Sequence, residues 1–203
     1  MLFVALLLSC DKDTSVESSI DSQIYYMPLD VGNKWQFDIS ARSGDSYAFF
    51  FKGTEDWEIL EVSNDKNIIL LKTCFNGFST SRGWGSSDTT KVYNHQDTLT
   101  ITAVSGYMKR VERTGKSTTI SFLDYLCRQL NNHSENGLGF YFPKSDSEEW
   151  IITEEKNRPG SSLKFSYKLQ ENIGFKQIYF SASVSDWIEQ VEFDLVDYYV
   201  KKE

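Results

Sequence analysis

Apolar and polar residues alternate one by one along several stretches of this sequence, and this pattern constrains the fold more than any other feature. In the first such stretch, Trp35, Phe37 and Ile39 are separated by polar side chains. Because successive side chains of a β-strand point to opposite faces, this period of two predicts a strand with one buried face. The same alternation recurs in segments 98–103, 163–169, 178–184 and 191–200.

Weaker runs of strand-forming residues lie between these segments, at 47–51, 57–62, 68–75, 107–113, 139–142 and 150–153. Turn-forming pairs such as Arg82-Gly83 and Pro159-Gly160 separate many of the runs. About ten strands with hairpin-length connections in one chain of this size predict a single all-β domain. We expect one antiparallel, strongly curved sheet, in the form of a half-barrel, a barrel or a sandwich.

The alternation changes phase once, within the last stretch. Val191, Phe193 and Leu195 share one parity, whereas the next apolar residues, Val196 and Tyr198, have the other. One extra residue in one strand of an antiparallel pair shifts the faces in this way, so the sequence predicts a β-bulge at this point.

One segment has the spacing of a helix. Its apolar residues follow intervals of three and four, and they are Ile120, Leu123, Leu126, Cys127 and Leu130. Asp124 and Arg128 are four residues apart and are expected to pair. The expected caps are Thr118, Thr119 and Ser121 at the start and Asn131-Asn132 at the end. We therefore predict one short helix that packs on a face of the sheet.

The N-terminus carries an apolar run at residues 2–8, which is too short to span the ~30 Å hydrocarbon core of a bilayer. The Leu-Leu-Ser-Cys sequence that ends at Cys10 resembles the lipobox of bacterial lipoproteins. This resemblance implies a removed signal peptide at 1–9, a lipidated Cys10 that begins a flexible acidic tether at 10–23, and a β domain at 24–203. The alternative is a buried first strand next to a free cysteine.

The location of the lipidated protein depends on residues 11–13, which read Asp-Lys-Asp. This triplet is similar to the export signal of surface lipoproteins in some Gram-negative lineages. In enteric bacteria, however, an aspartate directly after the lipidated cysteine favours the inner membrane. We expect a cell-envelope protein at the outer membrane and keep the inner membrane as the alternative.

A second resemblance concerns both ends of the predicted domain. Segment 28–37 (PLDVGNKWQF) resembles the opening of a group of bacterial lipoproteins that begin an all-β domain with Pro-Leu-x-x-Gly-Asn-x-Trp. Segments 172–175 (NIGF) and 195–200 (LVDYYV) are similar to the late turn and the last strand of that group. The members are mostly of unknown function, so the resemblance implies a fold and no chemistry.

The three cysteines of the chain are Cys10, Cys74 and Cys127. Disulfides persist outside the cytoplasm, so Cys74 and Cys127 are a possible bridge in an exported protein. Two separate buried thiols are an equally good interpretation, because free cysteine is among the most buried residue types.

Charge and motifs exclude several functions. The 21 Lys and Arg residues against 29 Asp and Glu give a net charge of −8, which is unlike a nucleic-acid-binding protein. The two histidines, His95 and His133, lie in polar, loop-like surroundings. The sequence has no residues at the spacing typical of zinc ligands and no Gly-x-Ser-x-Gly motif of serine hydrolases. We therefore predict no cofactor, no metal and no catalytic residues.

Trp84 is the candidate binding residue, because it lies between glycines in a polar segment. An exposed indole there could stack on a sugar or on a partner protein. The alternative is a loop tryptophan that folds back over the edge of the sheet.

These observations favour a monomeric, non-enzymatic envelope lipoprotein whose β domain binds a glycan, a peptide or another envelope protein. A second hypothesis is a carrier of an apolar ligand, which requires an apolar cavity of roughly several hundred Å³ under the helix, near Leu123 and Leu126. A third is a hydrolase with an unusual site, which requires coupled acids or a histidine beside a carboxylate in a cleft.

Overall fold

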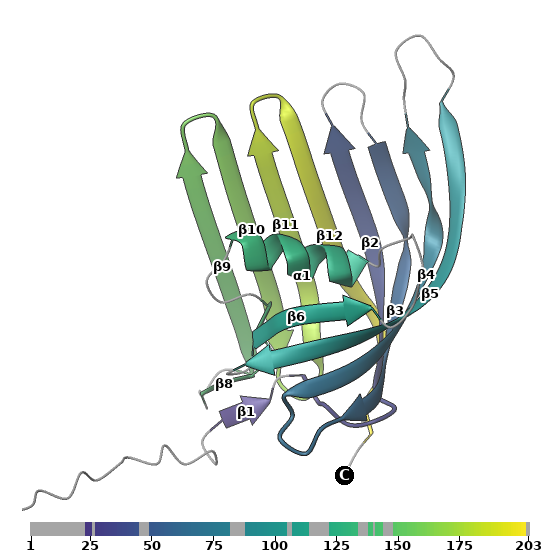
Figure 1. Cartoon of the computed structure of the whole chain (residues 1–203), viewed down its shortest axis with the longest axis vertical. Helices are drawn as coiled ribbons and strands as arrows, with labels where there is room; N and C mark the ends of the chain where they lie inside the picture. Colours follow the sequence, from purple (N-terminus) through teal and green to yellow (C-terminus); the bar gives the residue numbers. More distant parts are fainter. Residues whose placement is uncertain are drawn as a thin grey trace, which may run out of the picture.

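The computed structural model describes residues 23–25, 27–44, 49–81, 88–104, 107–113, 122–133, 138–139, 141–143 and 148–201. One ten-stranded antiparallel sheet dominates this part of the chain. The sheet curls into a half-barrel, and the helix α1 (Phe122–His133) crosses its concave face (Figure 1). The prediction of an all-β fold with one strongly curved sheet and one short helix is confirmed.

The sheet consists of two runs of consecutive strands that meet in its middle. The spatial order is β7-β6-β5-β4-β3-β2-β12-β11-β10-β9, so the last strand lies beside the first long one. The strands are β2 (Lys34–Gly44), β3 (Phe49–Val62), β4 (Ile68–Ser81), β5 (Thr89–Val104), β6 (Tyr107–Arg113), β7 (Leu138–Gly139), β9 (Glu149–Arg158), β10 (Ser161–Gln170), β11 (Gly174–Val184) and β12 (Trp187–Tyr199). A separate two-stranded ladder pairs β1 (Gln23–Tyr25) with β8 (Tyr141–Pro143).

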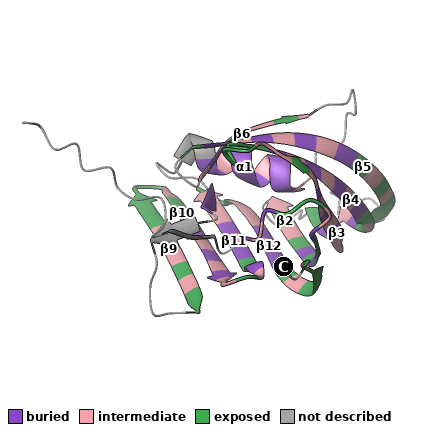
Figure 2. Ribbon diagram, turned by 90° about the horizontal axis from the view of Figure 1, so that it is seen from below, coloured by how far each residue is buried: buried purple, intermediate pink, exposed green. Residues whose placement is uncertain are grey.

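The alternating sequence pattern becomes an alternation of burial along the strands (Figure 2). In β2, Trp35, Phe37 and Ile39 are buried against the concave interior, and the residues between them are exposed. We call the face that carries the buried residues and α1 the inner face, and the opposite one the outer face. Burial of aromatic and aliphatic side chains on the inner face is the main stabilising contribution to this arrangement.

The predicted bulge is also confirmed. Leu195 pairs with Phe37 and Asp197 pairs with Gln36, so Val196 is the extra residue in β12. After Val196, odd-numbered residues of β12 lie on the outer face instead of the inner one. Asp197 and Tyr199 therefore lie in register with the outer-face residues of β2.

The helix covers the inner face with the residues that its periodicity indicated. Leu123, Leu126, Cys127 and Leu130 are all buried. The Arg128 guanidinium donates hydrogen bonds to both oxygens of Asp124, at 2.8 and 3.0 Å, as its spacing predicted. The helix continues to His133, beyond the end expected at Asn131-Asn132; the expected caps at 118–121 lie outside the described residues. Among the described residues, no helix is both long and apolar enough to cross a bilayer.

Two facing glycines allow β3 and β4 to approach closely where the sheet curls. Gly53 pairs with Gly77, and a Cβ on Gly53 would lie 2.2 Å from the carbonyl oxygen of Asn76. A Cβ on Gly77 would meet the ring of Phe51 at 2.5 Å. Only glycine fits at either position, because the space of a side chain is already occupied.

Candidate ligand-binding groove

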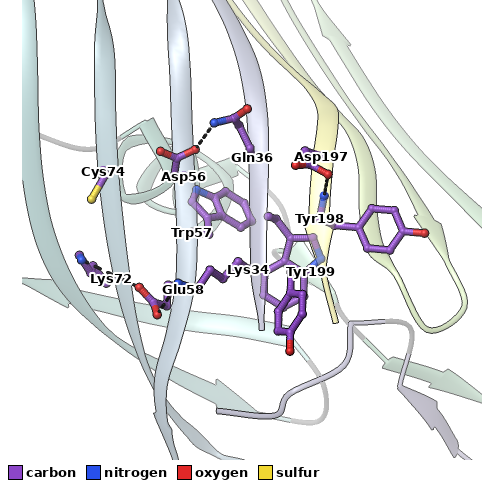
Figure 3. Close-up of a pocket in the computed structure, with 11 residues that line it drawn as sticks. Lys34, Gln36, Asp56, Trp57, Glu58, Lys72, Cys74, Asp197, Tyr198 and Tyr199 are labelled. Carbon is purple, nitrogen blue, oxygen red and sulfur yellow. Dashed lines mark hydrogen bonds and ion pairs between the residues drawn. The ribbon is translucent and has the colours of Figure 1, made fainter. Parts of the chain in front are cut away.

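A groove of about 380 Å³ lies on the outer face, where β12, β2, β3 and β4 run side by side (Figure 3). Its polar and aromatic lining includes Lys34, Gln36, Asp56, Glu58, Lys72 and Tyr199. This volume is within the range of small-molecule sites, which is about 300–1,000 Å³. The groove is therefore the candidate site that we describe from its residues upward.

Strand register places the lining residues in two rows across the sheet. In the first row Tyr199 pairs with Lys34, Lys34 with Glu58, and Glu58 with Lys72. In the second row Asp197, Gln36, Asp56 and Cys74 are paired in the same way. Tyr199 and Asp197 join these rows because the bulge at Val196 has turned them to the outer face.

Both lysines of the groove lie beside the same carboxylate, that of Glu58. The Lys34 ammonium lies 3.0 Å from one carboxylate oxygen of Glu58, and the Lys72 ammonium lies 3.9 Å from the other. The Gln36 amide donates a 2.7 Å hydrogen bond to Asp56. These contacts orient the polar groups across the sheet, and their partial exposure leaves them accessible to a ligand.

Tyr199 adds an aromatic surface to this polar lining. Its side chain is 59% exposed, and its ring lies beside Lys34 in Figure 3, whereas Tyr198 points away. A phenol ring next to fixed hydrogen-bonding groups can stack on the apolar face of a polar ring. The groove thus combines a flat contact with groups that donate and accept hydrogen bonds.

The two remaining cysteines are free thiols, and the possible bridge between them is not formed. Cys74 faces the groove on the outer side of β4, whereas Cys127 is buried under α1 on the inner side. The sheet therefore separates them. Burial raises the pKa of both thiols, and for Cys127 the carboxylates of Asp124 and Glu55 raise the pKa further. Both cysteines are accordingly protonated, weak nucleophiles at neutral pH.

His95 is not in the loop-like surroundings that the sequence suggested, but in the middle of β5. Its Nε2 atom is 3.9 Å from the carboxylate of Asp97, beyond hydrogen-bonding distance. The same Asp97 oxygen accepts a 2.5 Å hydrogen bond from Arg113, and its other oxygen accepts one from the Thr98 backbone amide. Asp97 therefore joins β5 to β6, and this geometry does not form the histidine–carboxylate pair of a general base.

Glu55 is a buried acid that the sequence did not single out. One carboxylate oxygen accepts a 3.0 Å hydrogen bond from the Trp57 indole, and the other accepts one of 3.0 Å from the backbone amide of Phe122 at the start of α1. Burial raises the pKa of Glu55 to about 7, although these hydrogen bonds favour the charged form. The carboxyl group thus attaches the first turn of the helix to the sheet.

A carrier requires an apolar cavity under the helix near Leu123 and Leu126, and the structure has no such cavity at these residues. Leu123, Leu126 and Leu130 each have 0% of their surface exposed. A cavity that could hold an apolar ligand would leave these side chains with surface accessible to a water-sized sphere. Instead, Phe122 packs against Phe51 and Phe75 with ring centroids 4.8 and 5.2 Å apart.

Other predicted residues lie outside what the structure describes. Cys10 and Trp84 belong to segments that are not described, and for His133 the backbone but not the side chain is described. Within the described ranges, no three His, Cys, Asp or Glu side chains come together in a way that could hold a metal ion.

Comparisons with known proteins give little further information. No family model matches the chain, and no curated protein matches it. A solved structure of a DUF1329 family protein from Desulfovibrio piger ATCC 29098 is similar at 9% sequence identity, covering 85% of this chain and 88% of that one. The TM-score is 0.25, and at this value the similarity supports no inference about fold or function.

Proposed function

We propose that this chain is a lipid-anchored protein of the bacterial cell envelope whose outer-face groove binds a neutral, hydroxyl-rich ligand of the oligosaccharide class, without catalysis. The observation that carries the proposal is the exposed ring of Tyr199 beside a row of fixed polar groups.

The chemistry of the groove favours a sugar over an anionic ligand. Both lysines that line the groove lie beside Glu58, so an anion would have to displace this carboxylate and would also meet those of Asp56 and Asp197. Hydroxyl groups can instead donate to the carboxylates of Asp56 and Glu58 and accept from the ammonium of Lys34. A sugar ring also has an apolar face that stacks on an aromatic side chain.

The anchor is supported by the sequence. The lipobox-like segment that ends at Cys10 is followed by polar residues with little to bury, and such segments act as flexible tethers. Each buried CH₂ of an acyl chain contributes about 0.8 kcal/mol, so two or more chains hold a protein on a membrane stably.

Calorimetric titration of the full chain in detergent, with a panel of neutral oligosaccharides, tests the groove. We expect at least one oligosaccharide to bind the wild type and to bind Tyr199→Ala about tenfold more weakly. The reason is that stacking of one sugar ring on an aromatic side chain contributes on the order of 1 kcal/mol to the free energy of binding. Trp187→Ala is the matched control, since this aromatic on the same strand is 54% exposed and lies outside the groove. Equal binding by Tyr199→Ala and the wild type, or no binding across the panel, contradicts the proposal.

Metabolic labelling with a fatty acid tests the anchor. We expect label in the wild-type chain and in the membrane fraction, and loss of both in Cys10→Ser. Cys74→Ser is the control, because this cysteine lies on the folded sheet. Label that persists in Cys10→Ser would remove the lipoprotein assignment while leaving the groove proposal intact.

A further inference from the structure

A second hollow, of about 480 Å³, lies on the outer face at the other end of β2, β3 and β4. Its lining includes Arg42, Phe50, Lys52, Phe78, Thr80 and Gln190. It shares no lining residue with the groove that contains Tyr199. The hollow is therefore a separate site on the same face.

Two exposed phenylalanines border the hollow. Phe50 and Phe78 are 49% and 48% exposed, although both belong to regular strands whose other face is buried. Phe50 pairs with Thr80 and Lys52 pairs with Phe78, which makes the two rings diagonal neighbours on adjacent strands. Aromatic side chains at this spacing offer a broad apolar surface to a ligand.

The floor of the hollow is packed from behind by inner-face aromatic side chains. The Phe51 side chain is buried beneath it, with its ring centroid 4.5 Å from Phe75 and 4.8 Å from Phe122. The Phe51 ring also lies against the Gly53–Gly77 pair, where a Cβ on either glycine would be within 2.9 Å of the ring. Phe50 and Phe78 are thus carried by strands whose inner side is tightly packed, and a preformed surface loses less entropy when a ligand binds.

The charge of the hollow is positive in a chain whose net charge is −8. Arg42 and Lys52 are its charged residues, and none of the described residues that line it is acidic. Arg42 pairs directly with Phe50, and Lys52 with Phe78, so each cation lies beside a ring. The neighbouring acid Glu192 pairs with Ser40 and accepts a hydrogen bond from Gln177 at 3.3 Å. An anion with an attached ring is the ligand that this arrangement complements.

We propose that this hollow binds the carboxylated sugar ring of an acidic oligosaccharide. The carboxylate of a uronic acid accepts hydrogen bonds from Arg42 and Lys52, while the face of its ring stacks on Phe50 or Phe78. Thr80 and Gln190 supply donors and acceptors for the ring hydroxyls. The proposal goes beyond the neutral ligand of the groove, and it depends on none of the groove residues.

The position of the hollow suits a tethered protein. It lies where β2 ends, β3 begins and β4 ends, near the upper end of the sheet in Figure 1. The first described strand, β1, lies at the opposite end of the sheet. A tether that reaches the domain at β1 leaves the hollow open to ligands.

The test is calorimetric titration of the full chain in detergent with trigalacturonate and with its fully methyl-esterified form, at low and at physiological salt. We expect the acid to bind about tenfold more tightly than the ester, with an affinity that falls as salt rises. Arg42→Gln and Lys52→Gln should each reduce the affinity for the acid about tenfold. Lys164→Gln is the charge control, because Lys164 is exposed on β10 outside the hollow.

A matched pair of variants tests the aromatic contact. Phe78→Ala should weaken binding of the acid, whereas Val92→Ala, which changes the 83% exposed residue opposite Phe78, should not. Equal binding of acid and ester, or unchanged binding in Arg42→Gln and Lys52→Gln, overturns the proposal. So does binding of 3-phenylpropionate as tight as that of trigalacturonate, since the ligand would then be an aromatic acid. Tyr199→Ala should leave binding of the acid unchanged, which separates failure of this site from failure of the groove.

Discussion

Glu55 and Glu58 lie three residues apart on β3 and show how differently the two faces of the sheet use an acidic side chain. Glu55 faces inward, has no exposed surface and caps the helix. The side chain of Glu58 faces outward, is 29% exposed and lies between two lysines. The inner acid contributes to the structure of the domain, whereas the outer one is available to a ligand. Parity along a strand thus places one acid in the core and the other in the groove for which we propose a ligand.

The largest expected difference between the faces comes from removing an apolar side chain. Leu126→Ala should lower the free energy of unfolding by about 3 kcal/mol, because the side chain is fully buried under α1 and its loss leaves a cavity. Phe78→Ala on the outer face should lower it by no more than about 1 kcal/mol, since half of that ring is already exposed. Urea unfolding followed by circular dichroism measures both, and equal losses would contradict the assignment of the two faces.

The pH dependence of stability should depend on Glu55. Its pKa is about 7 in the folded protein against 4.5 for the ordinary side chain, so the folded state holds the proton more tightly. The contribution of Glu55 to the free energy of unfolding is therefore greatest below pH 4.5. It is lost as pH rises from there through about 7, and the total loss is on the order of 3 kcal/mol. Thermal unfolding at pH 5 and pH 8 should show this loss in the wild type.

Glu55→Gln should flatten that dependence, because the amide stays neutral and keeps the shape of the side chain. Glu58→Gln is the matched control on the same strand and should retain the slope of the wild type. If Glu55→Gln loses stability with rising pH as steeply as the wild type does, another buried group carries the effect.

The close contact between β3 and β4 should be intolerant of a single added methyl group. Gly53→Ala places a Cβ 2.2 Å from the Asn76 carbonyl oxygen, and such overpacking costs about 1–3 kcal/mol. Thr54→Ala, at the next residue and on the outer face, should change stability by less than about 1 kcal/mol. Denaturant midpoints of the two variants compare the faces directly, and a Gly53→Ala protein as stable as Thr54→Ala would show that the strands can separate at no cost.

The sequence predicts what depends on local periodicity. The alternation predicts the buried face of β2, the change of phase at Val196 predicts the bulge, and the helical spacing predicts α1. It does not predict that β12 lies beside β2, because strand pairing depends on contacts between distant segments. The sequence alone therefore does not place Tyr199 next to Lys34, and it does not predict the groove. The polar neighbours Asn94 and Gln96 indicate a loop-like setting for His95, but in β5 these two residues are exposed on the outer face while His95 lies on the inner one.

The smallest expected effect on stability should accompany an effect on binding. Lys34→Ala removes the 3.0 Å ion pair with Glu58, but exposed pairs of this kind contribute about 0–1 kcal/mol because water screens them. The same change removes a hydrogen-bond donor from the groove, so the affinity for a neutral oligosaccharide should fall while the unfolding midpoint stays near that of the wild type. Lys164→Ala, an exposed lysine outside the groove, should change neither quantity. A Lys34→Ala variant that loses stability without losing affinity would show that the first row of the outer face is structural, like the inner face behind it.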